Sequence, residues 1–155
     1  MLSLFSLLVS LGLVGAAASS GARFRPDGWY RQLAKPAWTP PDLAFPIVWG
    51  ILYLLMALAA WRVFLAEPSI WRTAGLAVYA LQLAANAAWS WLFFGRRQIL
   101  LGLLDIALLL CLIAACIALF APSSALAAWL MVPYLLWVTL ALALNASVWR
   151  RNRRA

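Results

Sequence analysis

Residues 98–120 read QILLGLLDIALLLCLIAACIALF, a run in which Asp105 is the only charged side chain. About 20 apolar residues in an α-helix cross the core of a bilayer, so this run predicts a membrane-spanning helix. Four other stretches have the same length and character. The five predicted spans are 2–21, 45–65, 70–94, 98–120 and 124–149. The sequence therefore predicts an all-α fold, a polytopic membrane protein built as one five-helix transmembrane bundle.

The composition of the whole chain excludes an ordinary soluble domain. Of its 155 residues, 67% are hydrophobic and 10% are charged, whereas soluble domains have about half and about a quarter. The chain contains no His, which removes the usual general base and the commonest metal ligand. Its basic residues lie in short clusters between apolar runs, which argues against nucleic acid as a partner. We expect no metal site and no cofactor, and the lipid bilayer as the surroundings.

The distribution of basic residues predicts the orientation of the bundle. Ten of them lie in the long loop 22–44, in the turn 95–97 and in a basic C-terminal tail, 150–155, which share one side if the chain crosses five times. The other side carries only Arg62 and Arg72. Because cytoplasmic loops carry the excess of Lys and Arg, we expect the N-terminus outside and the C-terminus in the cytosol.

Polar and aromatic side chains of several spans fall in the half of the membrane next to loop 22–44. They are Trp49, Tyr53, Asn86, Trp89, Asp105 and Asn145. Gln82 shares a helical stripe with Asn86, and Trp137, near the middle of its span, shares one with Asn145, with Tyr134 nearby. Polar groups in hydrocarbon cost free energy unless they face the bundle interior or a cavity. The pattern favours an aromatic-lined pocket under loop 22–44, suited to a flat, apolar ligand with a few polar edges. The alternative is a set of interhelical hydrogen bonds that only hold the bundle together.

A stripe of small residues on span 70–94 predicts a contact between two copies of the chain. Ala80, Ala84 and Ala88 are spaced four residues apart, and such spacing lets helices approach closely. We therefore expect a homodimer through this helix.

A set of motifs along the chain resembles a known family. The motifs are WY (29–30), KPAWTPP (35–41), PIVW (46–49), QLAANAAW (82–89), FFG (93–95), PYLLW (133–137), LN (144–145) and VWR (148–150). Together they resemble the TspO/translocator protein family, the tryptophan-rich sensory proteins, known in animals as the peripheral benzodiazepine receptor. The resemblance covers nearly the whole chain from about residue 21.

The resemblance implies a five-helix bundle, commonly a homodimer, that binds porphyrins and other tetrapyrroles in a pocket beneath the first loop. Carried over motif by motif, it implies that the ligand-binding residues are Tyr30, Trp38, Trp49, Tyr53, Asn86, Trp89, Trp137, Ala141 and Asn145. We expect a membrane receptor or sensor for porphyrins and related flat hydrophobic ligands, with movement of the ligand within or across the membrane as an extension of that role.

Two other activities stay open at this point. Some members are associated with light-dependent porphyrin degradation, for which Trp49 and Trp137 would be the corresponding residues; no other catalytic group is expected. A translocator of sterols or drug ligands is the second alternative. This sequence departs from the family at Leu43, where a Trp is often found. It also has Ala146 and Ser147 in the stretch where the sterol-recognition pattern needs a Tyr.

Overall fold

Five long helices dominate the structure, a computed structural model that describes residues 2–24 and 26–153. They are α1 (Leu2–Arg23), α3 (Ala44–Phe64), α4 (Ile70–Ser90), α5 (Ile99–Phe120) and α6 (Ala125–Asn152). Each is long and apolar enough to cross a bilayer. The predicted all-α, five-helix membrane bundle is therefore confirmed.

Two local elements were not predicted. A short helix, α2 (Gly28–Gln32), lies within loop 22–44 and begins at Asp27, whose side chain accepts a hydrogen bond from the backbone N–H of Tyr30. The end of α4 continues as a single π-helical turn, η1 (Trp91–Gly95). Apolar patterning does not distinguish a π-helical turn from an α-helix, because both keep the same residues in the bundle.

The C-terminal helix is longer than predicted. α6 continues to Asn152, so the first residues of the predicted tail 150–155 are helical, while Arg154 and Ala155 lie outside the described residues. Arg25, one of the ten basic residues on the side of loop 22–44, also lies outside the described residues. Pro133 lies inside α6 without ending it.

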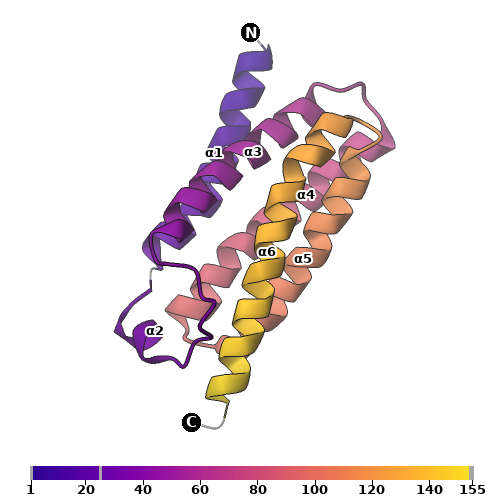
Figure 1. Ribbon diagram of the computed structural model, residues 1–155. Coiled ribbons are helices and arrows are strands. Elements are labelled where there is room, and N and C mark those ends of the chain that lie inside the picture. The colour runs from indigo at the N-terminus through magenta and orange to yellow at the C-terminus, as the bar shows by residue number, and fades with distance from the viewer. Residues whose placement is uncertain (1, 25, 154–155) are drawn as a thin grey trace.

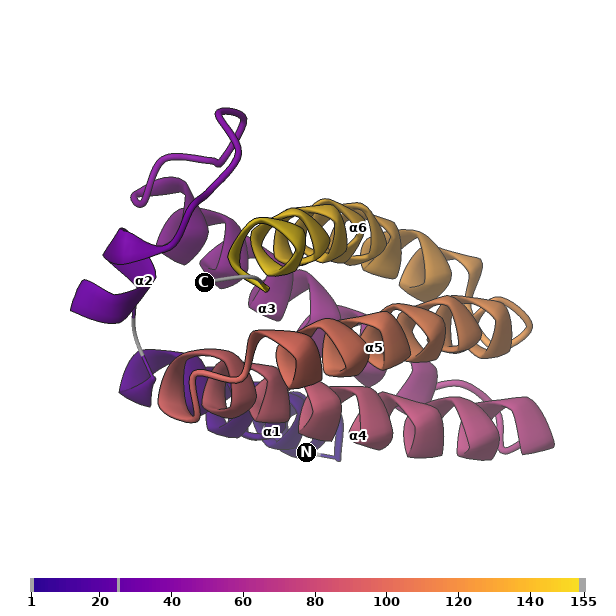
Figure 2. The ribbon, with the colours of Figure 1, turned by 90° about the horizontal axis from the view of Figure 1, so that it is seen from below.

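The long helices run side by side in Figure 1. In Figure 2, α5 lies between α4 and α6, and α1 packs against α3 and α4. The N-terminus of α1 and the C-terminus of α6 lie at opposite ends. Loop 22–44 with α2 lies at the same end as the C-terminus, beside the end of α6 in Figures 1 and 2. We call this end, formed by residues 22–44, 95–98 and 149–153, the loop end.

Small residues allow the helices to pack closely. Lipid tails are as apolar as the side chains, so close van der Waals contact drives helix association in membranes. Gly75 on α4 is buried, and a Cβ atom placed on it would lie 2.9 Å from Cδ1 of Phe120 on α5. Phe120 is fully buried and stacks on Tyr79, with ring centroids 6.0 Å apart. The ring therefore has little room to move away.

We predict that Gly75→Ala destabilises the bundle by about 1–3 kcal/mol, the usual cost of overpacking a filled core. Unfolding in detergent by a denaturing surfactant, followed by circular dichroism, measures the change. Gly50→Ala is the matched control, because a Cβ at Gly50 meets no atom within 4 Å. Equal stability of the two variants would show that the α4–α5 contact is looser than described.

Candidate functional site

A chain of hydrogen bonds crosses the interior of the bundle and joins three helices. The Tyr53 hydroxyl on α3 donates to Asn86 Oδ1 on α4 over 2.9 Å, and Asn86 Nδ2 donates to the Tyr134 hydroxyl on α6 over 2.9 Å. The Tyr134 hydroxyl then donates to Gln82 Oε1, back on α4, over 3.0 Å. Tyr134, Gln82 and Asn86 are buried. Because an unpaired polar group in apolar surroundings is costly, each of these side chains depends on the others.

Two buried N–H donors in this region lack an acceptor. Among the residues that the structure describes, neither Gln82 Nε2 nor the indole nitrogen of Trp137 has a hydrogen-bond partner. Trp137 lies three residues after Tyr134, so both project from one face of α6. Buried polar groups in folded proteins almost always have a partner in protein, water or ligand. These two donors are therefore positions where a hydrogen-bond acceptor on a ligand would be stabilised.

Aromatic rings surround the same region. The Trp49 ring lies 5.2 Å from Tyr53 and 6.0 Å from Tyr134, measured between ring centroids. Phe45, at the start of α3, lies edge-on to Trp137 at 5.8 Å. We call Trp49, Tyr53, Gln82, Asn86, Tyr134 and Trp137 the polar cluster.

A second group of rings lies nearer the loop end. Trp89 stacks on Phe93, with centroids 5.2 Å apart and planes 18° apart. Tyr30 of α2 is buried and lies edge-on to both Phe93 and Phe94, at 6.1 Å and 5.4 Å. These contacts attach the loop to the end of α4 and to η1. We call Tyr30, Trp89, Phe93, Phe94 and Asn145 the loop-end cluster.

Asn145 connects this cluster to α5. With its amide oxygen toward Trp89, it accepts from the indole N–H over 3.1 Å, and its Nδ2 donates to the backbone carbonyl of Ile99 over 3.3 Å. The opposite amide orientation would set donor against donor and acceptor against acceptor. Asn145 is buried, and its amide is used by the protein itself.

In addition to the ring contacts of Tyr30, two polar anchors join loop 22–44 to the bundle. Arg97, in the turn before α5, donates to the Asp27 carboxylate over 3.0 Å. Asn152, at the end of α6, donates to the backbone carbonyl of Ala34 over 3.0 Å and accepts from its N–H over 3.1 Å. The turn before α5 is unusual because Arg97 has a φ of 55°, a conformation that few residues other than Gly adopt.

Charge and burial shift two pKa values in the loop. The hydrogen bond from the Tyr30 N–H, assisted by Arg97, lowers the pKa of Asp27 below its usual value. The carboxylate that caps α2 therefore stays ionised at neutral pH, and its contacts are lost only when the pH falls through that lowered pKa. Burial raises the pKa of Tyr30, so its hydroxyl stays neutral at neutral pH.

The residues predicted to bind ligand fall into three groups. Trp49, Tyr53, Asn86 and Trp137 belong to the polar cluster, and Tyr30, Trp89 and Asn145 to the loop-end cluster. Ala141 is half-buried and packs on the core. Trp38 is 50% exposed, and the described residues give its side chain no hydrogen bond or ring contact with either cluster. The structure holds no ligand, so binding at these positions stays a prediction.

Sequence reasoning missed several residues of these clusters as site residues. Gln82 and Tyr134 stood out as polar residues within spans, but the resemblance gave them no ligand contact. Phe93 and Phe94 belong to the FFG motif of the resemblance, but the resemblance gave them no ligand contact, and Phe45 carried no signal because apolar rings are ordinary in a transmembrane helix.

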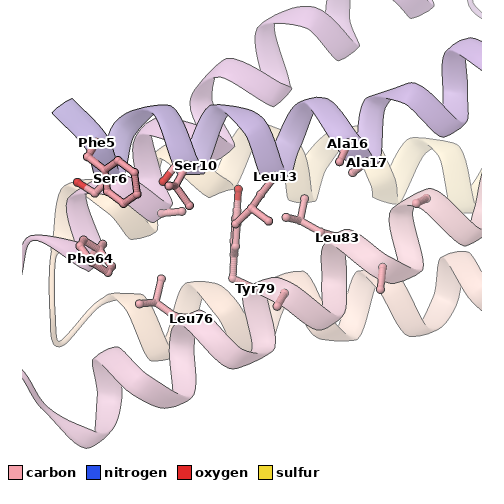
Figure 3. Close-up of a pocket in the computed structure, with 15 residues that line it drawn as sticks. Phe5, Ser6, Ser10, Leu13, Ala16, Ala17, Phe64, Leu76, Tyr79 and Leu83 are labelled. Carbon is pink, nitrogen blue, oxygen red and sulfur yellow. The ribbon is translucent and has the colours of Figure 1, made fainter. Parts of the chain in front are cut away.

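A pocket of about 620 Å³ lies elsewhere, between α1, α3 and α4 (Figure 3). Phe5, Leu13, Phe64, Tyr79 and Leu83 are among its lining residues. None of the nine predicted ligand-binding residues lines it. Ala80 and Ala84 do, so the small-residue stripe borders this groove. The pocket is thus distinct from the polar cluster.

Comparison with known proteins gives a consistent result. The model of the TspO/MBR family matches residues 4–150. Protein CrtK of Rhodobacter capsulatus is 43% identical over 137 residues, which cover 88% of this chain and 86% of that protein. The tryptophan-rich sensory protein of Cereibacter sphaeroides is 41% identical over 94% of this chain and 90% of its own. The human translocator protein is 38% identical over 96% of this chain and 88% of its own.

We predict that Asn152→Ala frees loop 22–44 at one of its two anchors. Two hydrogen bonds worth about 1 kcal/mol each are lost, so hydrogen exchange at the Ala34 amide should become about thirtyfold faster. Hydrogen-exchange mass spectrometry of the loop peptides measures this rate. Arg151→Ala is the control, because Arg151 bonds to Ser147 and not to the loop. An unchanged rate in Asn152→Ala, or an equal increase in the control, would contradict this anchoring.

Proposed function

This chain belongs to the TspO/MBR family of membrane sensor and translocator proteins, and from that premise we propose that it is a porphyrin receptor. In this proposal a porphyrin, or a related flat hydrophobic molecule, binds among the helices beneath loop 22–44. The polar cluster holds it, with the loop-end cluster beneath the lid. Movement of the ligand within or across the membrane would follow if the bound ligand left the site by a different route from the one by which it entered.

The observation that carries the proposal is the pair of unused donors in the polar cluster. Gln82 Nε2 and Trp137 Nε1 are buried without a partner among the described residues. Gln82 bonds to Tyr134, which faces the Trp49 ring, and Trp137 lies edge-on to Phe45. A porphyrin has a flat aromatic face and acceptor atoms at its edge. Its face suits stacking on rings, and its acceptors suit the two N–H groups. A cluster that served helix packing alone would be expected to pair its own donors.

The way the loop is held supports its role as a lid. Both side chains of the Asp27–Arg97 pair are exposed, at 42% and 58% accessible, and solvent screens the attraction between exposed charges. The Asn152 anchor is two hydrogen bonds at the protein surface. Opening the loop therefore breaks two weak polar anchors and separates Tyr30 from Phe93 and Phe94, but it unfolds none of the five long helices.

The proposal includes a homodimer through α4. Ala80 and Ala84 are exposed in the single chain, and Ala88 is half-buried. Their small side chains leave room for a helix of a second copy to approach. The cross-linked or native mass of the protein in detergent tests this association.

We predict that protoporphyrin binds the purified protein in detergent with one ligand per chain, seen as a shift of the porphyrin absorption band. Trp137→Phe removes the indole donor but keeps a ring, so the Kd should rise about fivefold to tenfold for the loss of one hydrogen bond. Trp129→Phe is the control, because Trp129 is 71% exposed on the outside of α6. No saturable shift, or equal weakening in both variants, would overturn the proposed site.

A further inference from the structure

A second pocket lies at the loop end, apart from both clusters. It has a volume of about 400 Å³ and lies between the start of α5 and the end of α6. Its walls include Arg97, residues 99–101, Trp149 and Arg153. No acidic residue is among the described residues that line it. The pocket is therefore cationic on one side and apolar on the other.

The two guanidinium groups keep free donors in this pocket. Arg97 gives one N–H to Asp27, and a guanidinium has five. The Arg153 guanidinium lies over the Trp149 ring, 5.3 Å from its centroid, which orients the group without using its hydrogen bonds. Two cations from separate elements therefore converge on one cavity, and the described residues use few of their donors.

The apolar wall continues onto the outer surface of the bundle. Leu100 and Leu101 are 46% and 43% exposed at the first turn of α5, where a membrane-spanning helix meets the headgroup region. Trp149 has the position expected of an interfacial tryptophan. A free inorganic anion would use the guanidinium groups alone, whereas a phospholipid would use both walls.

We propose that this pocket binds the headgroup of an anionic phospholipid, with the phosphate at Arg97 and Arg153 and an acyl chain along the exposed leucines of α5. Basic pockets at the ends of transmembrane helices suit such headgroups. Because Arg97 and Asn152 line the pocket and also anchor loop 22–44, the bound lipid lies against both anchors of the loop.

The test measures lipid binding to the intact protein in detergent by native mass spectrometry. Phosphatidylglycerol is the anionic probe and phosphatidylcholine the zwitterionic one. We expect tighter binding of phosphatidylglycerol, and about fivefold weaker binding of it after Arg153→Gln, since each basic residue near an anionic headgroup contributes about that factor. Arg62→Gln, at the opposite end of the bundle, should leave binding unchanged.

Three results would overturn the proposal. Equal binding of the two lipids would remove the role of charge, and an equal effect of Arg62→Gln would remove the role of this pocket. Displacement of phosphatidylglycerol by millimolar inorganic phosphate would assign the pocket to a free anion. Arg153 is exposed and its guanidinium lies over the Trp149 ring, and a circular dichroism spectrum like that of the parent confirms that its variant is folded.

Discussion

The hydrogen-bond chain from Tyr53 through Asn86 and Tyr134 to Gln82 is the constraint on which the rest of the structure depends. Inside a bilayer no water is available to satisfy polar groups, so these four side chains must meet one another. Successive residues of a helix point about 100° apart. A shift of α4 by one residue would therefore turn Asn86 away from both tyrosines, and the chain fixes how α3, α4 and α6 face each other.

The same helix orientations gather the two clusters toward the loop end. Asn86 sets the rotation of α4, and three residues later Trp89 reaches Asn145 of α6 and stacks on Phe93. Tyr30 then packs on Phe93 and Phe94 and seats the loop. Arg97 and Asn152 anchor the loop and also line the cationic pocket. The packing of the transmembrane helices is thus connected to the contacts of the loop through η1 and the start of α5.

Much of this arrangement could be predicted from the sequence, for a physical reason. Apolar runs of bilayer length predict the membrane-spanning helices, and the turn residues between the runs predict where these helices end. Asn86, Tyr53 and Tyr134 stand out because polar residues are rare in such runs. Their bonding order, and the use of Asn145 by Trp89, depend on rotamers that no spacing encodes. The π-helical turn could not be predicted because it leaves the apolar pattern unchanged, and α2 could not because a helix of five residues in a Pro-rich loop has no apolar period.

A double-mutant cycle on Asn86→Leu and Tyr134→Phe tests the central constraint most directly. Each change removes the bond between Nδ2 and the tyrosine hydroxyl, so the second should cost less once the first is made. We predict a coupling free energy of about 1 kcal/mol in surfactant unfolding, within the range of interhelical hydrogen bonds in membranes. Additive effects within about 0.3 kcal/mol would contradict a hydrogen-bond chain that holds these helices in register.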